Sequence, residues 1–437
     1  MERKKQTQHL AKYLDKKGRP LVAVTGMGMV TSLGCGKNEN WSKLTSGASG
    51  IRHIARFPTE GLRTAIAGTV DSVPSSSPTA AGRTKSMAAV AATEALTEAG
   101  LSQDDFPGPL FLATPPAEIE WPQRRRIYEA AQGSADHGYR RLIAAARAGN
   151  FEDIAEENQF VSVADYLAGH FGTKGLPYSV STACASGATA IQLGVEAIRR
   201  GEASTALCIG TDSSVQLEAL VRFSLLSALS TRNETPQTAS RPFSRGREGF
   251  VMAEGAGALV LEDLQAAVQR GATILGLVRG CGEMADDYHR TRSKPDGSAI
   301  IGAMRRAIDD ACIAPADIDH VNAHGTSTPE NDKMEFLSLS AVLGEHLQQT
   351  PVSSNKSMIG HTLSAAGAIE AVISLLTIQN GLIPPTINCD EQDPEITMDV
   401  VPGVARAARV RNVLSNSFGF GGQNACLVLG AYDASNA

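Results

Sequence analysis

Residues 176–198 read "LPYSVSTACASGATAIQLGVEAI", a stretch that begins like a buried strand and continues like a helix. Cys184 stands where the two patterns meet, among small neighbours. A helix N-terminus stabilises a thiolate through its dipole, and its free N–H groups can receive a developing oxyanion. A lone cysteine is more often a small core hydrophobe. This stretch alone therefore leaves two interpretations open, a buried thiol and a nucleophile.

The composition is that of a globular chain. Its 437 residues are 42% hydrophobic and 20% charged and include 42 glycines, which is typical of a soluble α/β protein with many tight turns. The net charge of −6 gives no reason to expect nucleic acid as a partner. An acidic carrier protein remains compatible with it, because a local basic patch can coexist with a negative total.

The cysteines and the first segment bear on location. There are seven cysteines, widely spread and without a CxxC pair, so neither a metal site nor a disulfide framework is indicated, and a reducing cytoplasm is the simplest compartment. Residues 1–20 form a polar, basic extension without the apolar run of a signal peptide. We expect no membrane span, since no stretch approaches roughly 18 apolar residues.

Strand and helix patterns alternate along the rest of the chain, which favours sheets covered by helices. Residues 85–100 have a helical pattern ending at a glycine, and residues 117–170 form a charged, helix-like excursion in which Arg124, Arg125 and Arg126 are expected to face solvent. The expected strands lie at 21–34, 109–116, 206–212, 257–263, 274–280, 320–325, 413–417 and 425–430.

Gly26 and Gly28 resemble the first two glycines of a dinucleotide-binding fingerprint. Thr31 occupies the position of the third glycine, however, and no acidic residue ends a second strand about 20 residues later. A turn from strand to loop is the preferred interpretation.

The chain contains a weak internal repeat. Residues 249–263 and 417–430 share a glycine-rich segment followed by an apolar strand, and the small-residue helix at 185–198 has a counterpart at 363–376. These two helices could pack closely. We therefore expect two similar halves, 21–267 and 268–437.

Two histidines have neighbours suited to catalysis. His324 follows an expected strand, and His361 precedes an expected helix, five residues after Lys356. Each histidine has an adjacent glycine, which would leave an imidazole accessible, although either alone would more often be a core residue. Residues 416–424, NSFGFGGQN, form a glycine-rich loop whose N–H groups can approach a ligand.

Four motifs, STACASGA, AHGTSTPEND, KSMIGH and NSFGFGG, together resemble the motif set of the β-ketoacyl-[acyl-carrier-protein] synthases, the elongating condensing enzymes of fatty acid synthesis. The stretches 229–263 and 383–390 also match that family in order and spacing. The resemblance implies an α/β thiolase-like fold of two similar halves in a five-layered α-β-α-β-α sandwich. It also implies a homodimer, with acyl carrier protein as partner and no cofactor or metal beyond the phosphopantetheine that the carrier bears.

The resemblance assigns a role to each motif. Cys184 would accept the acyl group, the N–H groups of Cys184 and Phe420 would form an oxyanion hole, and His324 and His361 would promote malonyl decarboxylation. Lys356 would pair with Glu335 and order the histidines. The remaining implied residues are Asp332 as a support, Thr326 and Thr328 at the pantetheine arm, Phe418 and Gly419 in the gating loop, and Asp286 and His289 in a second gating loop.

The chain departs from the family pattern at three positions, Gln423, Ser244 and Ala253, where threonine, aspartate and glycine are common. The segment after residue 116 also lacks the family's glycine-rich continuation, so a specialised enzyme for unusual or very long acyl chains is one possibility. Three alternatives are a type II polyketide ketosynthase, a non-catalytic chain-length partner, and an acyl-binding or NAD-binding protein. Partner subunits typically lack the nucleophile, and a simple binding protein leaves both histidine motifs unexplained.

Overall fold

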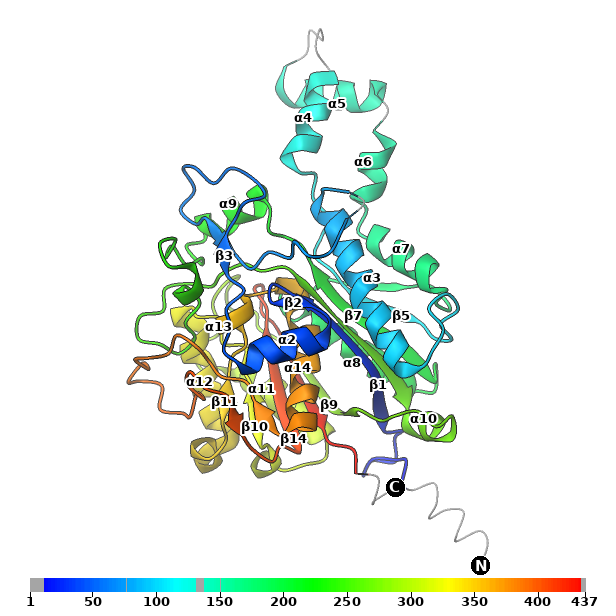
Figure 1. Cartoon of the computed structure of the whole chain (residues 1–437), viewed down its shortest axis with the longest axis vertical. Coiled ribbons are helices and arrows are strands. Elements are labelled where there is room, and N and C mark those ends of the chain that lie inside the picture. The colour runs from blue at the N-terminus through cyan, green and yellow to red at the C-terminus, as the bar shows by residue number, and fades with distance from the viewer. Residues whose placement is uncertain (1–11, 76, 131–136, 150, 434–437) are drawn as a thin grey trace, which may run out of the picture.

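The computed structural model describes residues 12–75, 77–130, 137–149 and 151–433, and one large mixed sheet organises them (Figure 1). The strand order is β11-β10-β14-β15-β9-β1-β8-β7-β5-β6, with β2 paired to β1. These strands are β1 (Val22–Thr31), β2 (Gly34–Cys35), β5 (Leu110–Ala113), β6 (Tyr178–Val180), β7 (Thr205–Asp212), β8 (Gly255–Asp263), β9 (Gly276–Ala285), β10 (His320–Asn322), β11 (Val352–Ser353), β14 (Asn412–Phe418) and β15 (Gln423–Gly430). All eight expected strands are confirmed. Two short pairs, β3 (Arg52–His53) with β4 (Ile66–Ala67) and β12 (Leu382–Ile383) with β13 (Arg406–Ala407), lie apart from it.

Some helices cover the outer faces of the sheet, and others lie in the space that its two parts enclose. They are α2 (Lys37–Thr45), α3 (Ala80–Ala99), α4 (Trp121–Ala130), α5 (Gly138–Ala148), α6 (Glu152–Glu157), α7 (Ser162–Phe171), α8 (Ser186–Arg199), α9 (Leu217–Leu225), α10 (Leu264–Gln269), α11 (Ser298–Asp310), α12 (Pro329–Leu343), α13 (Lys356–Ile359) and α14 (Ala366–Asn380). Helix α8 contacts β5, β7 and β15, and α14 contacts β14, β15 and β8. Both helices therefore lie between two parts of the sheet, one that contains β5, β7 and β8 and one that contains β14 and β15.

Alternating side chains define the layers. In β8, Ala258 and Val260 join the core beneath α3, whereas Leu259 joins the central core around α8 and α14. In β15, Leu427 joins the central core and Val428 the core beneath α11. Successive residues of a strand point to opposite faces, so each part of the sheet has an outer helix layer and shares the inner one. The expected five-layered sandwich is confirmed.

The two central helices cross with their backbones in close contact. A Cβ atom added to Gly187 of α8 would lie 2.5 Å from the backbone nitrogen of Ala368, and one added to Gly367 of α14 would lie 2.5 Å from that of Ala188. Real Cβ atoms do not approach so closely, and only glycine allows this separation. The close packing expected from the two small-residue helices is therefore confirmed.

The glycines of β1 have a different role from the one expected. Gly26 and Gly28 lie within the strand, and a Cβ atom on either would come within 1.9 Å of a carbonyl oxygen of α3, that of Ala95 or of Ala91. The interpretation as a turn from strand to loop was wrong, because these residues let a helix lie directly on the strand.

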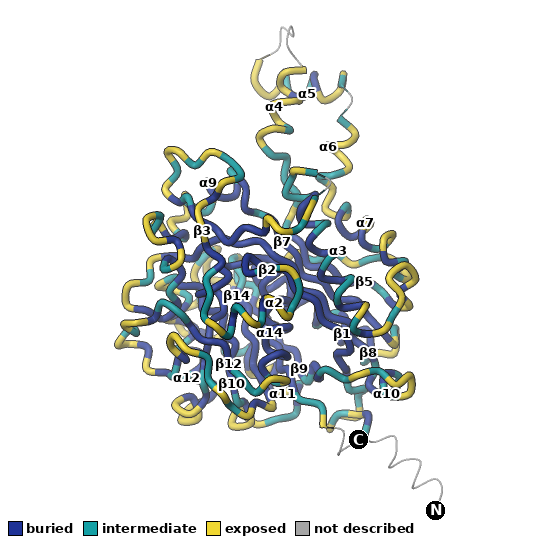
Figure 2. The backbone as a smooth tube through the Cα atoms, in the orientation of Figure 1, coloured by how far each residue is buried: buried dark blue, intermediate teal, exposed yellow. Residues whose placement is uncertain are grey.

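The charged excursion forms α4 to α7, and α4, α5 and α6 project from the body (Figure 1), with many exposed residues (Figure 2). Its arginines face solvent as expected. Arg125 forms an ion pair with Glu129 at 2.6 Å, and Arg126 forms one with Asp153 at 2.6 Å. Exposed pairs of this kind contribute little to stability.

The N-terminal extension is described from residue 12, and residues 1–11 lie outside the described part. The guanidinium group of Arg19 donates a hydrogen bond of 2.6 Å to Asp310, the last residue of α11. The ammonium group of Lys16 donates one of 2.9 Å to the carbonyl oxygen of Cys312. This part packs on the protein surface. The proposed boundary between the two halves, after residue 267, falls inside α10.

One segment of the described residues, Leu363–Asn380, is long and apolar enough to span a membrane, contrary to the expectation that none would approach that length. It comprises α14 and the turn before it, and 83% of it is buried inside the protein. Its apolar character follows from packing against both parts of the sheet.

Replacing Gly187 by alanine should separate α8 from α14. We expect Gly187→Ala to lower the free energy of unfolding by about 1–3 kcal/mol, the usual cost of overpacking a core. Gly169→Ala is the matched control, because Gly169 is also helical and has nothing within 4 Å of an added Cβ. Chemical denaturation measures both variants, and an equal effect on both would contradict the close crossing.

Candidate active site

Cys184 lies between β6 and α8, in a tight turn that points its side chain into the protein. Ala183 has a positive φ of 50°, and Ser186 closes the turn by accepting the Thr182 N–H at 2.8 Å and donating to the carbonyl oxygen of Ala183 at 2.5 Å. The Cys184 side chain is buried. The predicted junction of strand, turn and helix is therefore present, with the sulfur at the start of α8.

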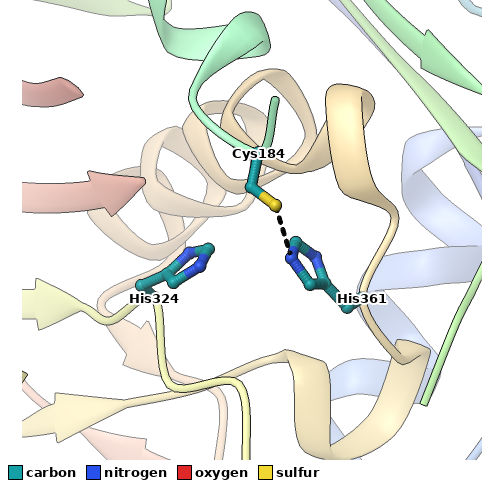
Figure 3. A group of neighbouring side chains, drawn as sticks. All are labelled: Cys184, His324 and His361. Carbon is teal, nitrogen blue, oxygen red and sulfur yellow. Dashed lines mark hydrogen bonds between the residues drawn. The ribbon is translucent and has the colours of Figure 1, made fainter. Parts of the chain in front are cut away.

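His361 lies beside the sulfur. Its Nε2 is 3.1 Å from Sγ of Cys184, and its Nδ1 accepts the Leu363 N–H at 3.3 Å (Figure 3). Because Nδ1 accepts this bond, the proton of the neutral imidazole is on Nε2, which donates to the sulfur. The backbone of His361 is held by the Val251 carbonyl oxygen at 2.7 Å and by the Ala253 N–H at 2.9 Å.

His324 follows β10 and completes the group. Its ring centroid is 5.2 Å from that of His361, nearly perpendicular to it, and 5.5 Å from that of Phe418. Glu335 of α12 accepts the backbone N–H groups of His324 at 2.8 Å and of Gly325 at 2.7 Å. A carboxylate thus holds the backbone turn that presents the imidazole.

The expected pairing of Lys356 with Glu335 is wrong. Lys356 forms a buried ion pair with Glu370 of α14, and both side chains are at most 2% exposed. Both carboxylate oxygens of Glu335 accept hydrogen bonds from the His324 turn, and Asn416 donates to Oε1 of Glu335 at 3.0 Å. Lys356 still lies near both imidazoles, and its positive charge therefore helps to lower the pKa of each.

Asp332 supports the loop after His324. Its carboxylate accepts the Phe243 N–H at 2.8 Å and the Ser327 N–H at 3.2 Å, and Arg247 lies 3.6 Å away. Ser327 has a positive φ of 72°, so the loop between Gly325 and Thr328 is held in a turn. The predicted supporting role agrees with this geometry.

The glycine-rich loop after β14 meets the loop after β9. The Phe420 N–H is directed at the sulfur of Cys184, which agrees with the predicted oxyanion hole. The Asp286 N–H donates to the carbonyl oxygen of Gly422 at 2.7 Å, and the Gly421 N–H donates to that of Arg290 at 2.8 Å. The two predicted gating loops are therefore in direct contact.

A cavity of about 480 Å³ leads to the cysteine. It brings together most of the predicted residues, while Lys356, Glu335 and Asp332 lie behind its wall. Thr326 and Thr328 share a hydrogen bond of 2.9 Å at one side of it. The predicted residues lining it are Cys184, Asp286, His289, Thr326, Thr328, His324, His361, Phe418, Gly419 and Phe420.

Burial dominates the electrostatics of the site. It raises the pKa of Cys184 to about 11, although the Phe420 N–H and the charge of Lys356 act in the opposite direction. It also holds the pKa values of His324 and His361 well below the usual range of histidine, with Lys356 adding to the effect. Near neutral pH both imidazoles are therefore uncharged hydrogen-bond donors, and the thiol needs help to ionise.

The three departures from the family pattern have structural counterparts. The carbonyl oxygen of Gln423 accepts the Gly419 N–H at 2.6 Å, so its backbone closes the gating loop. The hydroxyl of Ser244 accepts the Gly246 N–H at 3.3 Å. Ala253 directs its methyl group toward Gly68 and Gly360, where an added Cβ would meet it at 2.9 Å.

Three further residues contribute that the sequence interpretation did not single out. Glu370 is the partner of Lys356, and it is the single charged residue of the segment 363–376, which could have revealed it. Asp212 accepts the Ser364 N–H at 3.0 Å and so braces the turn after His361. The ring of Phe250 lies 5.3 Å from that of His361. No local sequence signal distinguishes the last two.

The sulfur and imidazole nitrogens of Cys184, His324 and His361 lie within 4.8 Å of one another, a set that could hold a soft metal ion. The same set suits covalent catalysis, with a nucleophile, two hydrogen-bond donors and adjacent N–H groups. The sequence indicated no metal, and that remains an expectation.

A cysteine and two imidazoles brought together in a thiolase-like sandwich are the arrangement of a condensing enzyme. Residues 20–267 match the model of the β-ketoacyl synthase N-terminal domain, and residues 275–390 match that of the C-terminal domain. The chain belongs to the β-ketoacyl synthase family, and it is a condensing acyltransferase.

Relatives from two pathways resemble the chain to the same degree. It is 37% identical to the tetracenomycin polyketide synthase ketoacyl synthase alpha subunit of Streptomyces glaucescens, over 93% of this chain and 96% of the relative. It is 36% identical to 3-oxoacyl-[acyl-carrier-protein] synthase 2 of Coxiella burnetii, over 93% and 98%. A ketosynthase solved with its type II polyketide acyl-carrier protein and bound to a hexaketide has a TM-score of 0.84 at 32% identity, over 95% and 100%.

A double-mutant cycle tests the corrected ion pair. Lys356→Met should lower the free energy of unfolding by about 3–5 kcal/mol, because it leaves the buried Glu370 carboxylate without its partner. Combining it with Glu370→Gln should restore part of that loss. The matched cycle uses Glu335→Gln, and stronger coupling of Lys356 to Glu335 than to Glu370 would contradict the pairing.

The pKa of Cys184 predicts how fast the resting enzyme is alkylated. A thiol with a pKa of about 11 is largely protonated at neutral pH, so the rate of alkylation by iodoacetamide should rise about tenfold per pH unit between about pH 7 and pH 10. His361→Ala removes a donor to the sulfur and should slow alkylation several-fold at about pH 8. The exposed His346→Ala is the control, and a rate already at its plateau at pH 7 would refute the raised pKa.

Proposed function

We propose that this protein is a 3-oxoacyl-[acyl-carrier-protein] synthase, which condenses malonyl-carrier with a cysteine-bound acyl chain in fatty acid elongation. The observation that carries the proposal is the sulfur of Cys184 at 3.1 Å from Nε2 of His361, with His324 facing both in one cavity. One nucleophile with two uncharged imidazole donors suits a reaction that needs first an acyl acceptor and then a site for an enolate.

The first half-reaction loads the enzyme. The Cys184 thiolate attacks the carbonyl carbon of an acyl-carrier thioester, and the oxyanion that forms is stabilised by the N–H groups of Cys184 and Phe420. When the intermediate collapses, the carbon–sulfur bond to the pantetheine thiol breaks. The acyl group stays on Cys184, and the carrier leaves as a free thiol, its sulfur taking up the proton that the Cys184 thiol gave up.

The second half-reaction forms the carbon–carbon bond. Malonyl-carrier loses carbon dioxide, and the electron pair of the broken bond becomes an enolate whose oxygen accepts hydrogen bonds from His324 and His361. The α-carbon of the enolate then attacks the acyl carbonyl, and the bond to Cys184 breaks. The product is a 3-oxoacyl-carrier two carbons longer, and the sulfur is again free.

The remaining residues hold this machinery and its substrates. Thr326 and Thr328 would meet the pantetheine arm at the cavity wall. Phe418, Gly419, Asp286 and His289 would belong to the loops that admit the arm, while Lys356, Glu335 and Asp332 position the histidines. The cofactor need is met by the phosphopantetheine of the substrate, and the enzyme itself would require none.

Acyl carrier protein is the proposed partner. A structural relative was solved in complex with its acyl-carrier protein, and this chain covers the whole of that relative at 32% identity. We propose a homodimer by analogy with the family. All seven cysteines are free thiols, which suits a reducing compartment such as the cytoplasm.

A type II polyketide ketosynthase is the second candidate. The 37% identity to the tetracenomycin enzyme favours it as much as the 36% identity to the Coxiella enzyme favours fatty acid elongation. Both would use the chemistry described above. A chain-length partner without activity is disfavoured by the intact Cys184.

Incubation with acyl-carrier protein thioesters should add one acyl group to Cys184. Intact-mass measurement should detect the adduct in the wild type but not in Cys184→Ser. A series of fatty acyl and 3-oxoacyl chains separates the two candidates, because an elongating synthase should prefer reduced chains. No adduct in the wild type at any chain length would contradict the proposal.

His324→Ala should separate the two half-reactions. Acyl transfer to Cys184 should persist, whereas release of carbon dioxide from malonyl-carrier should fall at least about 100-fold, as expected when a main oxyanion donor is lost. Radiolabelled malonyl-carrier measures the second step. Decarboxylation at the wild-type rate would show that His324 has another role.

A further inference from the structure

The loop from Asp286 to Gly297 places two arginines at the mouth of the active-site cavity. Arg290 and Arg292 both line the cavity, and both are exposed. Neither guanidinium forms an ion pair or a hydrogen bond with any described residue. Two unpartnered guanidinium groups at the entrance of a substrate channel form a natural binding site for an anion.

Two carboxylates near these arginines, Asp286 and Glu248, are engaged elsewhere. Asp286, in the same loop, accepts the Tyr288 N–H at 2.9 Å and the Lys294 N–H at 2.7 Å. Glu248, on the cavity wall, accepts the hydroxyl of Ser230 at 3.1 Å and the Thr231 N–H at 3.0 Å. Both carboxylates are thus held by bonds to other groups, and neither forms an ion pair with the two guanidinium groups.

The wall of the entrance formed by the start of α12 carries charges of both signs, unlike the side that carries the two arginines. Glu330 and Lys333 line it from the start of α12, and Lys333 is 3.7 Å from Glu395. The positive charge of Lys333 is thus partly balanced, and Glu330 would repel an anion. An anionic ligand entering the cavity is therefore favoured on the side of Arg290 and Arg292.

We propose that Arg290 and Arg292 bind the phosphodiester group of the substrate's phosphopantetheine arm. This inference rests on the proposed function, which makes a carrier-borne thioester the substrate. The phosphodiester is the one group of the arm with a permanent negative charge, and planar guanidinium groups match its paired oxygens. Binding there would leave the arm's thioester end to extend inward to Cys184.

The position of Arg290 gives this site a second consequence. Its carbonyl oxygen accepts the Gly421 N–H at 2.8 Å, one residue from Phe420, whose own N–H is directed at Cys184. Gly422 of the glycine-rich loop also packs tightly against Asp286. A Cβ atom added to Gly422 would lie 2.0 Å from the carbonyl oxygen of Asp286. Drawing Arg290 toward a phosphate would therefore move the segment that carries the oxyanion-hole N–H. Occupation of the arginine site and readiness of the cysteine are coupled through the backbone.

The test compares acyl thioesters of phosphopantetheine, of pantetheine without the phosphate, and of the carrier protein. The measured quantity is the ratio of kcat/KM for the phosphorylated arm to that for the unphosphorylated arm. In Arg290→Ala/Arg292→Ala this preference should fall about tenfold, which is the effect of about 1.4 kcal/mol of lost binding. The wild-type preference should also weaken as salt is raised.

Lys294→Ala is the matched control. It removes one positive charge from the same loop, but Lys294 does not line the cavity, so the preference should be kept. Arg409→Ala removes an exposed guanidinium that does not line the cavity.

The coupling has its own readout. Binding of unacylated phosphopantetheine should change the rate of Cys184 alkylation in the wild type, and the double arginine variant should lose this response.

Three outcomes would overturn the inference. These are an unchanged preference in the double variant, an equal loss in Lys294→Ala, or a loss confined to the carrier-protein substrate. The last would mean that the arginines contact the acidic surface of the carrier. Failure of the wild type to acylate Cys184 with every thioester would instead overturn the proposed function, so the two failures are distinguishable.

Discussion

Helices α8 and α14 cross with their backbones in contact at Gly187 and Gly367, and the approach of Cys184 to His361 depends on this crossing. One residue, Ala185, separates Cys184 from the first residue of α8, and one residue, Thr362, separates His361 from the turn that opens α14. Bringing the two helix starts together therefore brings the sulfur to 3.1 Å from the imidazole. Side chains larger than hydrogen at the crossing would hold the helices apart and widen this gap.

Burial of the site explains why its polar groups are so thoroughly bonded. A buried carboxylate is costly unless hydrogen bonds or a positive charge compensate it. Glu335 and Asp332 meet this condition with backbone N–H groups, and Glu370 meets it with Lys356. The same bonds hold His324 and its loop in place. The groups that make burial tolerable thus also position the imidazole of His324.

The two loops at the entrance behave as one structural unit. Backbone bonds join Asp286 to Gly422 and Arg290 to Gly421, so neither loop can move far without the other. One loop carries Arg290 and Arg292 at the entrance, and the other carries the Phe420 N–H beside Cys184. Short backbone connections therefore link the proposed binding site for the substrate arm to the proposed oxyanion hole.

Local patterns explain how much could be predicted. The strands at 206–212 and 257–263 and the helix ending at Gly100 were recognisable because their hydrophobic spacing and end signals are local. The motifs around Cys184, His324 and His361 were recognisable for the same reason, and the structure places these three residues in one cavity. The pairing of Lys356 was misassigned because a buried lysine takes whichever carboxylate the packed helices bring near it. Gly26 and Gly28 were misread because their neighbour, α3, is about 65 residues distant in the chain.

The sequence by itself determined the main elements of the fold and singled out Cys184, His324 and His361, because each depends on residues that are adjacent or periodic along the chain. The tertiary structure alone decided the distance between sulfur and imidazole, the partner of Lys356 and the junction of the two entrance loops. Each of these joins segments far apart in sequence, and only the packing of α8, α14 and the folded sheet brings them together.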